Sequence, residues 1–350
     1  MSGIDDVVLE HAMRRALELA ATPGVPHGPN PRVGCVLLAP DGTEIAEGFH
    51  RGAGTLHAEA AALAEAGSAA RGATAVVTLE PCNHTGRTGP CAQALINAGV
   101  VRVVFAQPDP NPTATGGAET LRAAGVEVRS GVLEHEARLL NHAWTFSYEH
   151  GRPFVTWKFA TTLDGRSAAA DGSSRWVTNP AGRRDTHLLR AVCDAILVGT
   201  GTILIDDPEL TVRDELDQPF PRERQLLRVV MGERDLPPTA RVRNDAAETV
   251  HLRTRDVHAV LADLHARGRQ HLFLEGGPTV AAAFLSAGCV DEVVAYVAPK
   301  LLGAGLPAVG DLGIAAISEA IQLEDIDIAV LDDNIRITGR PSNAIHGKGF

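Results

Sequence analysis

One histidine, one glutamate and two cysteines near the N-terminal end constrain the fold more than any other feature of the chain. Leu56-His57-Ala58-Glu59 supplies an imidazole and a carboxylate, and Cys82 and Cys91 each follow a proline. His57, Cys82 and Cys91 offer three ligands to zinc, which leaves one tetrahedral position open for water. An open position is typical of a catalytic zinc site, where Glu59 would move protons between water and a leaving group.

The pattern resembles the His-x-Glu…Pro-Cys-x-x-Cys signature of the zinc deaminases. It departs from that signature because eight residues, not two, separate Cys82 from Cys91. A structural zinc site is the alternative, and it would be closed by a fourth protein ligand, for which His84 inside the spacer is the only nearby candidate. The catalytic interpretation is favoured because Glu59 and both Pro-Cys dipeptides agree with it.

Composition narrows the classes of protein to consider. With 350 residues, 45% of them hydrophobic, the chain can bury a large core and is expected to form two domains. A net charge of −11 argues against nucleic acid as a partner, since phosphate contacts need a basic surface. No apolar run approaches the roughly 20 residues that span a bilayer, so no membrane partner is expected. Five cysteines and a polar Met1–Glu10 favour a reduced, cytoplasmic protein.

Alternating helix and strand patterns predict an α/β fold over residues 1–148. The expected elements are a helix over 5–20, a hairpin of strands 33–39 and 44–49, a helix from 57 to 67, a strand over 73–79, a helix over 91–98, a strand over 101–106 and a helix–strand pair ending at 128. The three metal ligands would therefore lie at helix N-termini and strand ends, where the helix dipole favours thiolate over thiol.

The pattern changes around residues 141–152, where we place a domain boundary. A second α/β domain is expected over 152–340, followed by a loose tail over 341–350. Its expected elements are strands over 154–160, 195–198, 226–231, 249–252, 271–274, 292–297 and 335–338, with helices over 179–191 and 280–287.

The motifs together identify a family. Asn30-Pro31, His50 and the run Cys82-Asn83-His84-Thr85-Gly86-Arg87-Thr88-Gly89-Pro90-Cys91 look like the bifunctional riboflavin-biosynthesis pyrimidine deaminase/reductase family. The long spacer between the cysteines is a feature of this family. The resemblance continues through the second half in three further motifs: Thr162-Leu163-Asp164-Gly165-Arg166, Asp206-Asp207-Pro208 with Leu210-Thr211-Val212-Arg213, and Glu275-Gly276-Gly277-Pro278-Thr279.

The resemblance implies a cytidine-deaminase-like three-layer α/β/α domain followed by a dihydrofolate-reductase-like α/β domain. It further implies hydrolytic deamination of 2,5-diamino-6-(5-phosphoribosylamino)pyrimidin-4-one at zinc, and then reduction of the ribosyl side chain to ribityl by NADPH. The partner would be a small phosphorylated pyrimidine, and the chain would form a homodimer or a higher homo-oligomer.

The resemblance also implies roles for individual residues. The deaminase would use Glu59 as acid and base, His57, Cys82 and Cys91 as zinc ligands, and Asn30, His50, His84 and Arg87 as substrate contacts. The reductase would bind its substrate through Ser174, Arg190, Leu210, Arg213 and Glu275. Its cofactor would contact Ala160, Trp176, Thr202, Asp206, Gly277, Pro278, Thr279, Val280, Ala281, Ala282 and Ala283. Glycines before a helix let the backbone approach a pyrophosphate, which is the physical reason for the last group.

Three other functions stay open on the sequence alone. A nucleic-acid base deaminase shares the His-x-Glu and Pro-Cys core, although the acidic balance and the second domain count against it. A deaminase with a degenerate reductase half is possible because the segment from about Arg213 to Arg269 matches the family poorly. A non-catalytic regulator that binds metal is the third, but it would have no use for Glu59.

Overall fold

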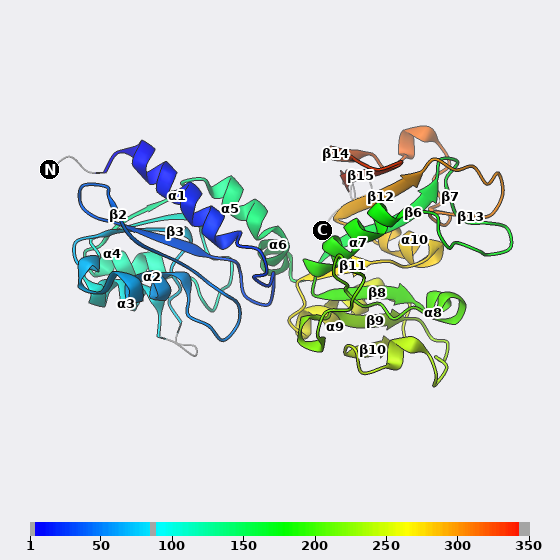
Figure 1. Ribbon diagram of the computed structural model, residues 1–350, viewed down its shortest axis with the longest axis horizontal. Helices are drawn as coiled ribbons and strands as arrows, with labels where there is room; N and C mark the ends of the chain where they lie inside the picture. The colour runs from blue at the N-terminus through cyan, green and yellow to red at the C-terminus, as the bar shows by residue number, and fades with distance from the viewer. Residues whose placement is uncertain (1–3, 85–88, 343–350) are drawn as a thin grey trace. The chain divides into compact units, whose positions relative to one another are not determined.

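The computed structural model describes residues 4–84 and 89–342 (Figure 1). The chain divides into two compact units, residues 1–150 and 151–350. Most of the predicted tail, residues 343–350, and the predicted substrate contact Arg87 lie outside the described residues. None of the helices in the described part combines the length and apolar character needed to cross a bilayer.

A five-stranded sheet in the order β2-β1-β3-β4-β5 forms the centre of the first unit. Its strands are β1 Gly34–Leu38, β2 Glu44–Phe49, β3 Thr74–Leu79, β4 Arg102–Gln107 and β5 Glu127–Ser130. The helices are α1 Asp6–Ala20, α2 Ala58–Ala66, α3 Cys91–Ala98, α4 Gly117–Ala123, α5 Glu134–Leu140 and α6 His142–His150. β1 is antiparallel to both of its neighbours, whereas β3, β4 and β5 run parallel.

Strand residues alternate between two apolar clusters, and this alternation builds the three layers. Cys35 and Val77 face a cluster with α2, α3 and α4, while Val36 and Val76 face α1 and α5 on the other side. The predicted three-layer α/β/α arrangement is therefore confirmed. Figure 1 shows α1 and α5 on one face of this sheet and α2, α3 and α4 on the opposite face.

An eight-stranded sheet in the order β10-β9-β8-β11-β6-β12-β15-β14 forms the second unit. Its strands are β6 Phe154–Thr162, β8 Ala195–Gly199, β9 Leu227–Met231, β10 Thr249–Leu252, β11 His271–Leu274, β12 Glu292–Ala298, β14 Leu323–Leu331 and β15 Asn334–Pro341. A small separate sheet pairs β7 Arg166–Ala168 with β13 Leu306–Pro307. The helices are α7 Pro180–Ala191, α8 Thr200–Asp206, α9 Val257–Ala266 and α10 Pro278–Ser286.

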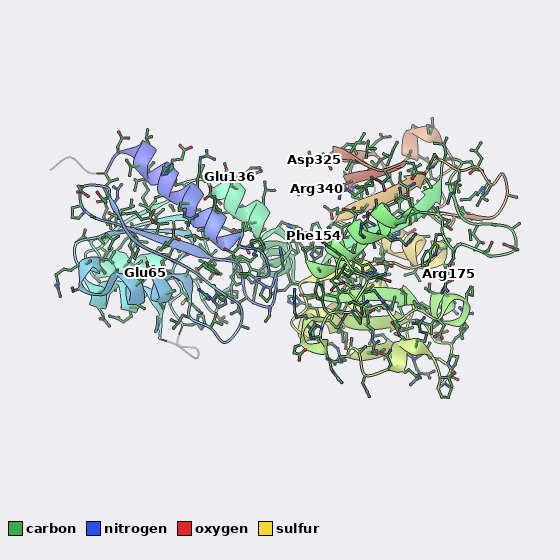
Figure 2. The ribbon with its side chains drawn as sticks, viewed as in Figure 1. Glu65, Glu136, Phe154, Arg175, Asp325 and Arg340 are labelled. Carbon is green, nitrogen blue, oxygen red and sulfur yellow. The ribbon has the colours of Figure 1, made fainter. Side chains whose placement is uncertain are left out.

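Two elements at the end of the chain differ from the sequence-based expectation. The edge strand β14 was not predicted, because Glu324, Asp325 and Asp327 make it polar and such residues are depleted in strands. Asp325 is instead paired with Arg340 of β15, at 3.8 Å between Oδ2 and Nη1, on the exposed hairpin (Figure 2). β15 also extends through Pro341, which was assigned to the tail.

Candidate active sites

The metal-ligand candidates of the first unit meet where two helices begin. His57 is the N-cap residue of α2, and Cys91 is the first residue of α3, with Pro90 as its N-cap. Cys82 follows the buried strand β3 after Glu80-Pro81. The helix dipoles of α2 and α3 thus direct their positive ends toward the sulfur atoms and favour negative charge there.

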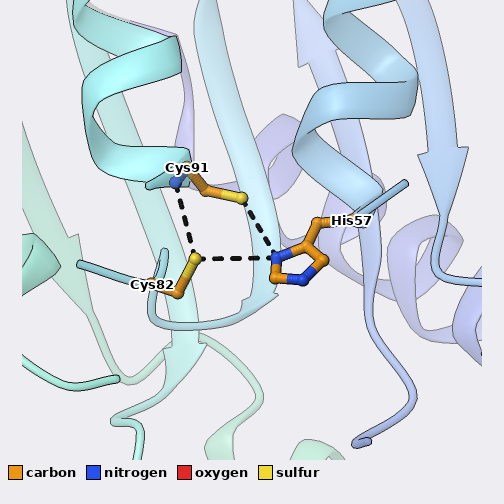
Figure 3. A group of neighbouring side chains, drawn as sticks. All are labelled: His57, Cys82 and Cys91. Atoms are coloured by element: carbon orange, nitrogen blue, oxygen red, sulfur yellow. Dashed lines mark hydrogen bonds between the residues drawn. The ribbon is translucent and has the colours of Figure 1, made fainter. Parts of the chain in front are cut away.

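The three side chains are close enough to share one ion. His57 Nδ1 lies 3.6 Å from Cys82 Sγ and 3.3 Å from Cys91 Sγ, and the Cys91 backbone N–H donates to Cys82 Sγ at 3.4 Å (Figure 3). All three ligand atoms lie within 4.8 Å of one another. His84 does not join this group among the described residues, which argues against the closed, structural zinc site.

The two cysteine sulfurs are close enough to shift each other's pKa in opposite directions. A hydrogen bond from the Cys91 thiol, with His57 nearby, lowers the pKa of Cys82 to about 4. The hydrogen bond to Cys82, together with burial, raises the pKa of Cys91. Two adjacent thiolates therefore repel each other unless a cation compensates them. Two sulfurs and one imidazole form a donor set that zinc accepts, so the residues fit the metal.

Glu59 stands beside the ligands in the first turn of α2. Its side chain is almost fully buried, with 4% of the residue exposed. Burial raises the pKa of Glu59 to about 7, so its protonated and ionised forms differ little in free energy near neutral pH. A carboxyl group with this pKa can both accept and release a proton, which is what an acid–base catalyst needs.

A pocket joins these groups to the predicted substrate contacts. Asn30, His50 and His84 all line it, together with Glu59 and the metal-ligand candidates His57 and Cys82. The His50 Nδ1–H donates to the Leu56 carbonyl at 2.9 Å, so its Nε2, 3.0 Å from Asn30 Nδ2, accepts from that amide. This leaves the Asn30 carbonyl oxygen to face a ligand. His84 Nδ1 is buried and has no hydrogen-bond partner among the described residues.

The pocket also contains residues that sequence reasoning missed. Asp109 and Asn111 line it from the loop after β4, and burial, with the Glu80 carboxylate nearby, raises the pKa of Asp109 to about 6. Glu80 accepts backbone N–H groups of Asp109, Gly116 and Ala118 at 3.0–3.3 Å and thereby fixes this loop. The run Asp109-Pro110-Asn111-Pro112 at a strand end was the signal that could have revealed it.

Helix α6 contributes an aromatic wall that was likewise missed. Trp144 and Tyr148 line the pocket and stack edge to face, with ring centroids 5.1 Å apart. The two residues are four apart on one helix, so they share a face. The aromatic residues in this stretch were noticed only as a marker of the domain boundary.

In the second unit, three adjacent parallel strands gather the predicted reductase residues. β8, β11 and β6 lie side by side and run parallel. α8, which carries Thr202 and Asp206, follows β8, and Glu275 follows β11. Ala160 lies near the carboxyl end of β6. Ligands of open α/β sheets bind at this edge, so the arrangement suits a cofactor.

The two glycines before α10 have different tasks. A Cβ on Gly276 would meet Val280 Cβ at 2.7 Å, so a side chain there would collide with the helix. A Cβ on Gly277 would meet nothing within 4 Å. Gly276 therefore permits close packing, whereas Gly277 leaves open space at the N-terminus of α10, where a phosphate group is favoured.

The structure narrows the predicted cofactor contacts along α10. The Val280 and Ala281 N–H groups both donate to the Gly277 carbonyl, at 3.0 and 3.1 Å. Ala281 is fully buried in the core, and Val280 and Ala283 also pack against that cluster. Residues 280–283, which include Ala282, lie within α10, and the Val280 and Ala281 N–H groups are already used in the first turn of this helix. Gly277, Pro278 and Thr279 are the part of the motif best placed to meet a ligand.

Arg190 and Glu275 form one ion pair instead of two independent contacts. Arg190 Nε and Nη2 donate to the two Glu275 oxygens at 2.7 and 2.8 Å, and Nη1 donates to the Thr211 carbonyl at 3.0 Å. Arg190 above all, with Lys158 nearby, compensates the burial and holds the pKa of Glu275 at about 2. The side-on face of the guanidinium is thus occupied, which leaves one N–H on each terminal nitrogen for a phosphate.

The remaining predicted substrate contacts, and the predicted cofactor contact Trp176, lie on loops. The Leu210 side chain is buried in an apolar cluster, so only its backbone can meet a ligand. Arg213 donates to Glu209 at 2.8 Å and remains partly exposed. Trp176 is 62% exposed beneath the Arg183 guanidinium, 4.7 Å from its ring centre, and Ser174 precedes it on the same loop.

Lys158 of β6 was missed as a functional candidate. Burial lowers the pKa of its ammonium group, and Glu275 is close enough to oppose that shift. Its Nζ lies 5.4 Å from the centre of the Tyr296 ring. The sequence did contain a signal for Lys158, because it lies in a predicted strand among apolar residues and threonines. Lysines are seldom buried without a partner, so such a position indicates a nearby acidic group.

Fold and site together define a two-domain enzyme with a zinc-binding deaminase unit and a nucleotide-dependent reductase unit. Residues 7–107 match the cytidine and deoxycytidylate deaminase zinc-binding region, and residues 153–337 match the RibD C-terminal domain. The match to the RibD C-terminal domain includes residues 213–269, a segment in which no family motif was identified after Arg213.

Relatives and solved structures agree with this class. The chain is 52% identical to riboflavin biosynthesis protein RibD of Mycobacterium tuberculosis H37Rv, covering 84% of this chain and 86% of the relative. It is 42% identical to RibD of Escherichia coli K12, over 90% and 94% of the two chains. The structure of Acinetobacter baumannii RibD superposes with a TM-score of 0.89 at 37% identity, covering 96% of this chain and 99% of that chain.

The chain belongs to the RibD family of bifunctional riboflavin-biosynthesis enzymes. It carries both the deaminase and the reductase domain, as the sequence motifs predicted. The deaminase domain implies zinc and the reductase domain a nicotinamide cofactor. The alternatives of a nucleic-acid base deaminase and of a non-catalytic regulator are therefore set aside.

Proposed function

We propose that the first unit deaminates 2,5-diamino-6-(5-phosphoribosylamino)pyrimidin-4-one, with His57, Cys82 and Cys91 holding zinc. The observation that carries this proposal is the buried Glu59 carboxyl group in the pocket that His57 and Cys82 also line. Zinc at such a site supplies a water that ionises near neutral pH. The Glu59 carboxylate would accept a proton from the attacking water and pass it to the leaving amine. Asn30 and His50 orient the substrate, with His84 and Arg87 on the spacer.

The second unit, assigned to residues 152–340, would reduce the ribosyl side chain of the deaminated product with NADPH. The cofactor supplies a hydride for C1′ of the sugar. Gly277, Thr202 and Asp206 bind the cofactor at the strand ends, and Arg213, with the free N–H groups of Arg190, anchors the substrate phosphate. The Lys158 ammonium interacts electrostatically with Glu275 and Arg190. It is the candidate to deliver a proton to the ring oxygen of the sugar, whose bond to C1′ breaks as the hydride adds.

The open space at Gly277 gives a direct test of the cofactor site. Gly277→Val should leave the fold intact, because the added Cβ meets no protein atom within 4 Å and the backbone φ of −65° suits any residue. The side chain should exclude a phosphate, so we expect the NADPH dissociation constant to rise at least about tenfold. Fluorescence titration measures it. Unchanged NADPH affinity would place the cofactor elsewhere.

We further propose that the chain forms a homodimer through the β14–β15 hairpin. Ile328 and Val330 of the edge strand β14 are 62% and 73% exposed. Exposed apolar side chains on a strand with one unpaired edge favour association with another chain. Light scattering should give the mass of a dimer for the native chain and that of a monomer for Val330→Asp. A native monomer would refute this interface.

The five free cysteines suit the reducing cytoplasm that the composition suggested.

A further inference from the structure

Residues 214–248, here called the bracing segment, follow directly after the loop Asp207–Arg213, here called the substrate loop. The bracing segment contributes β9 to the eight-stranded sheet, and residues on either side of β9 pack over one face of that sheet. Its residues Leu226, Leu236 and Val242 share one buried apolar cluster with Leu210 and Val212 of the substrate loop. The two stretches therefore fold as one layer over the sheet.

Gln225 of the bracing segment binds the backbone of the substrate loop on both sides of one residue. Its Oε1 accepts the Val212 N–H at 2.8 Å, and its Nε2 donates to the Val212 carbonyl at 3.1 Å. Nε2 also donates to the Phe220 carbonyl at 2.7 Å. Val212 is fully buried, so its N–H depends on Gln225, whereas its carbonyl also accepts the Phe220 N–H at 3.1 Å.

Two arginines of the same segment hold the other end of the loop. Arg228 is fully buried and donates to the Glu209 carbonyl at 3.2 Å, and to Asn244 at 2.8 and 2.6 Å. The Arg241 N–H donates to Asp207 Oδ1 at 2.8 Å, and its guanidinium pairs with Glu209 at 2.9 Å. Contacts from the bracing segment thus reach the substrate loop at Asp207, Glu209 and Val212.

The substrate loop needs such support because of its backbone. Asp207 and Leu210 have φ values of 41° and 55°. This left-handed region is unfavourable for residues other than glycine, and it persists where surrounding contacts fix the chain. The backbone of Leu210 and the side chain of Arg213 can meet a ligand only in the directions that this conformation sets.

We propose that the bracing segment positions the substrate loop of the reductase, and that Gln225 is its principal positioning residue. The proposal rests on the assignment of Leu210 and Arg213 to the reductase substrate site. It assigns a positioning role to residues 214–248, for which the sequence motifs predicted no function.

The test compares two equal replacements in the full-length chain. Gln225→Met keeps the length of the side chain and removes all three hydrogen bonds. Gln218→Met makes the same change at an exposed residue whose side-chain amide donates, within the described part of the chain, to the Leu216 carbonyl alone. We expect Gln225→Met to raise the KM for 5-amino-6-(5-phosphoribosylamino)uracil between about 10- and 100-fold, as displacement of a substrate-orienting loop does. The NADPH dissociation constant should stay at its native value, and Gln218→Met should resemble the native chain.

The outcomes separate positioning from folding. A native KM in Gln225→Met would overturn the proposal, and so would equal losses of substrate and NADPH binding in a folded variant. If Gln225→Met does not fold, Arg241→Ala is the deciding variant. The Arg241 side chain is 52% exposed, so its removal should leave the fold intact while it breaks the ion pair with Glu209. A raised KM there supports the bracing role, and a native KM refutes it. A native chain that binds NADPH but reduces no substrate would instead refute the proposed reductase, and the bracing role with it.

Discussion

Glu59→Gln should lower the rate of deamination at least about 100-fold, which is the low end of the contribution of a positioned acid–base group. Glutamine has the size of glutamate but cannot accept a proton from water at neutral pH. The buried carboxyl group has a pKa of about 7, so the native side chain can hold the proton between its two transfers. The variant loses this step while its pocket keeps its shape.

Zinc content and NADPH-dependent reduction should survive in Glu59→Gln, because Glu59 is not one of the three clustered ligands. Glu65→Gln is the matched control, since Glu65 is an exposed residue of the same helix (Figure 2). It should deaminate at the native rate. If Glu59→Gln loses both activities and its zinc, Glu59 supports the fold and our assignment of the proton transfers is wrong.

Cys91→Ser should remove zinc and with it the deaminase activity. The Cys91 sulfur lies 3.3 Å from His57 Nδ1, and a serine hydroxyl is a shorter, harder and far less acidic ligand than a thiolate. Loss of this ligand should weaken metal binding at least about 100-fold, the most that loss of a supporting outer contact usually costs. Elemental analysis of the purified variant measures the metal, and the deaminase assay measures the consequence.

Cys193→Ser serves as the control for this substitution. Cys193 lies in the second unit, where its sulfur contacts the Leu189 carbonyl at 3.4 Å, and a hydroxyl can keep that hydrogen bond. Zinc and deamination should both be native in this variant. Native deaminase activity in a zinc-free preparation of the unmodified chain would contradict the hydrolytic mechanism.

Local sequence patterns were enough to predict much of the fold. The elements β2 Glu44–Phe49 and α3 Cys91–Ala98 have the predicted bounds, because a Pro-Asp-Gly turn and a Pro-Cys helix start mark them. The clustering of His57, Cys82 and Cys91 was predictable because these residue types and their spacing are visible in the sequence itself.

Features that depend on distant contacts were not predictable from local patterns. The Arg190–Glu275 pair joins residues 85 positions apart, and no periodicity reports such a pair. Lys158 and Asp109 become unusual only through burial, which raises or lowers their pKa after the chain has folded. The edge strand β14 pairs with β15 although its acidic residues disfavour a strand, since tertiary pairing overrides propensity.

The central claim is that one chain performs both reactions, and one measurement tests it most directly. The purified, zinc-loaded chain is incubated with 2,5-diamino-6-(5-phosphoribosylamino)pyrimidin-4-one, with and without NADPH, and the products are followed by mass spectrometry. Without NADPH we expect only the deaminated pyrimidine that still carries its ribosyl group. With NADPH we expect the ribityl product and equivalent oxidation of the cofactor. A deaminated product that persists in the presence of NADPH would contradict the claim.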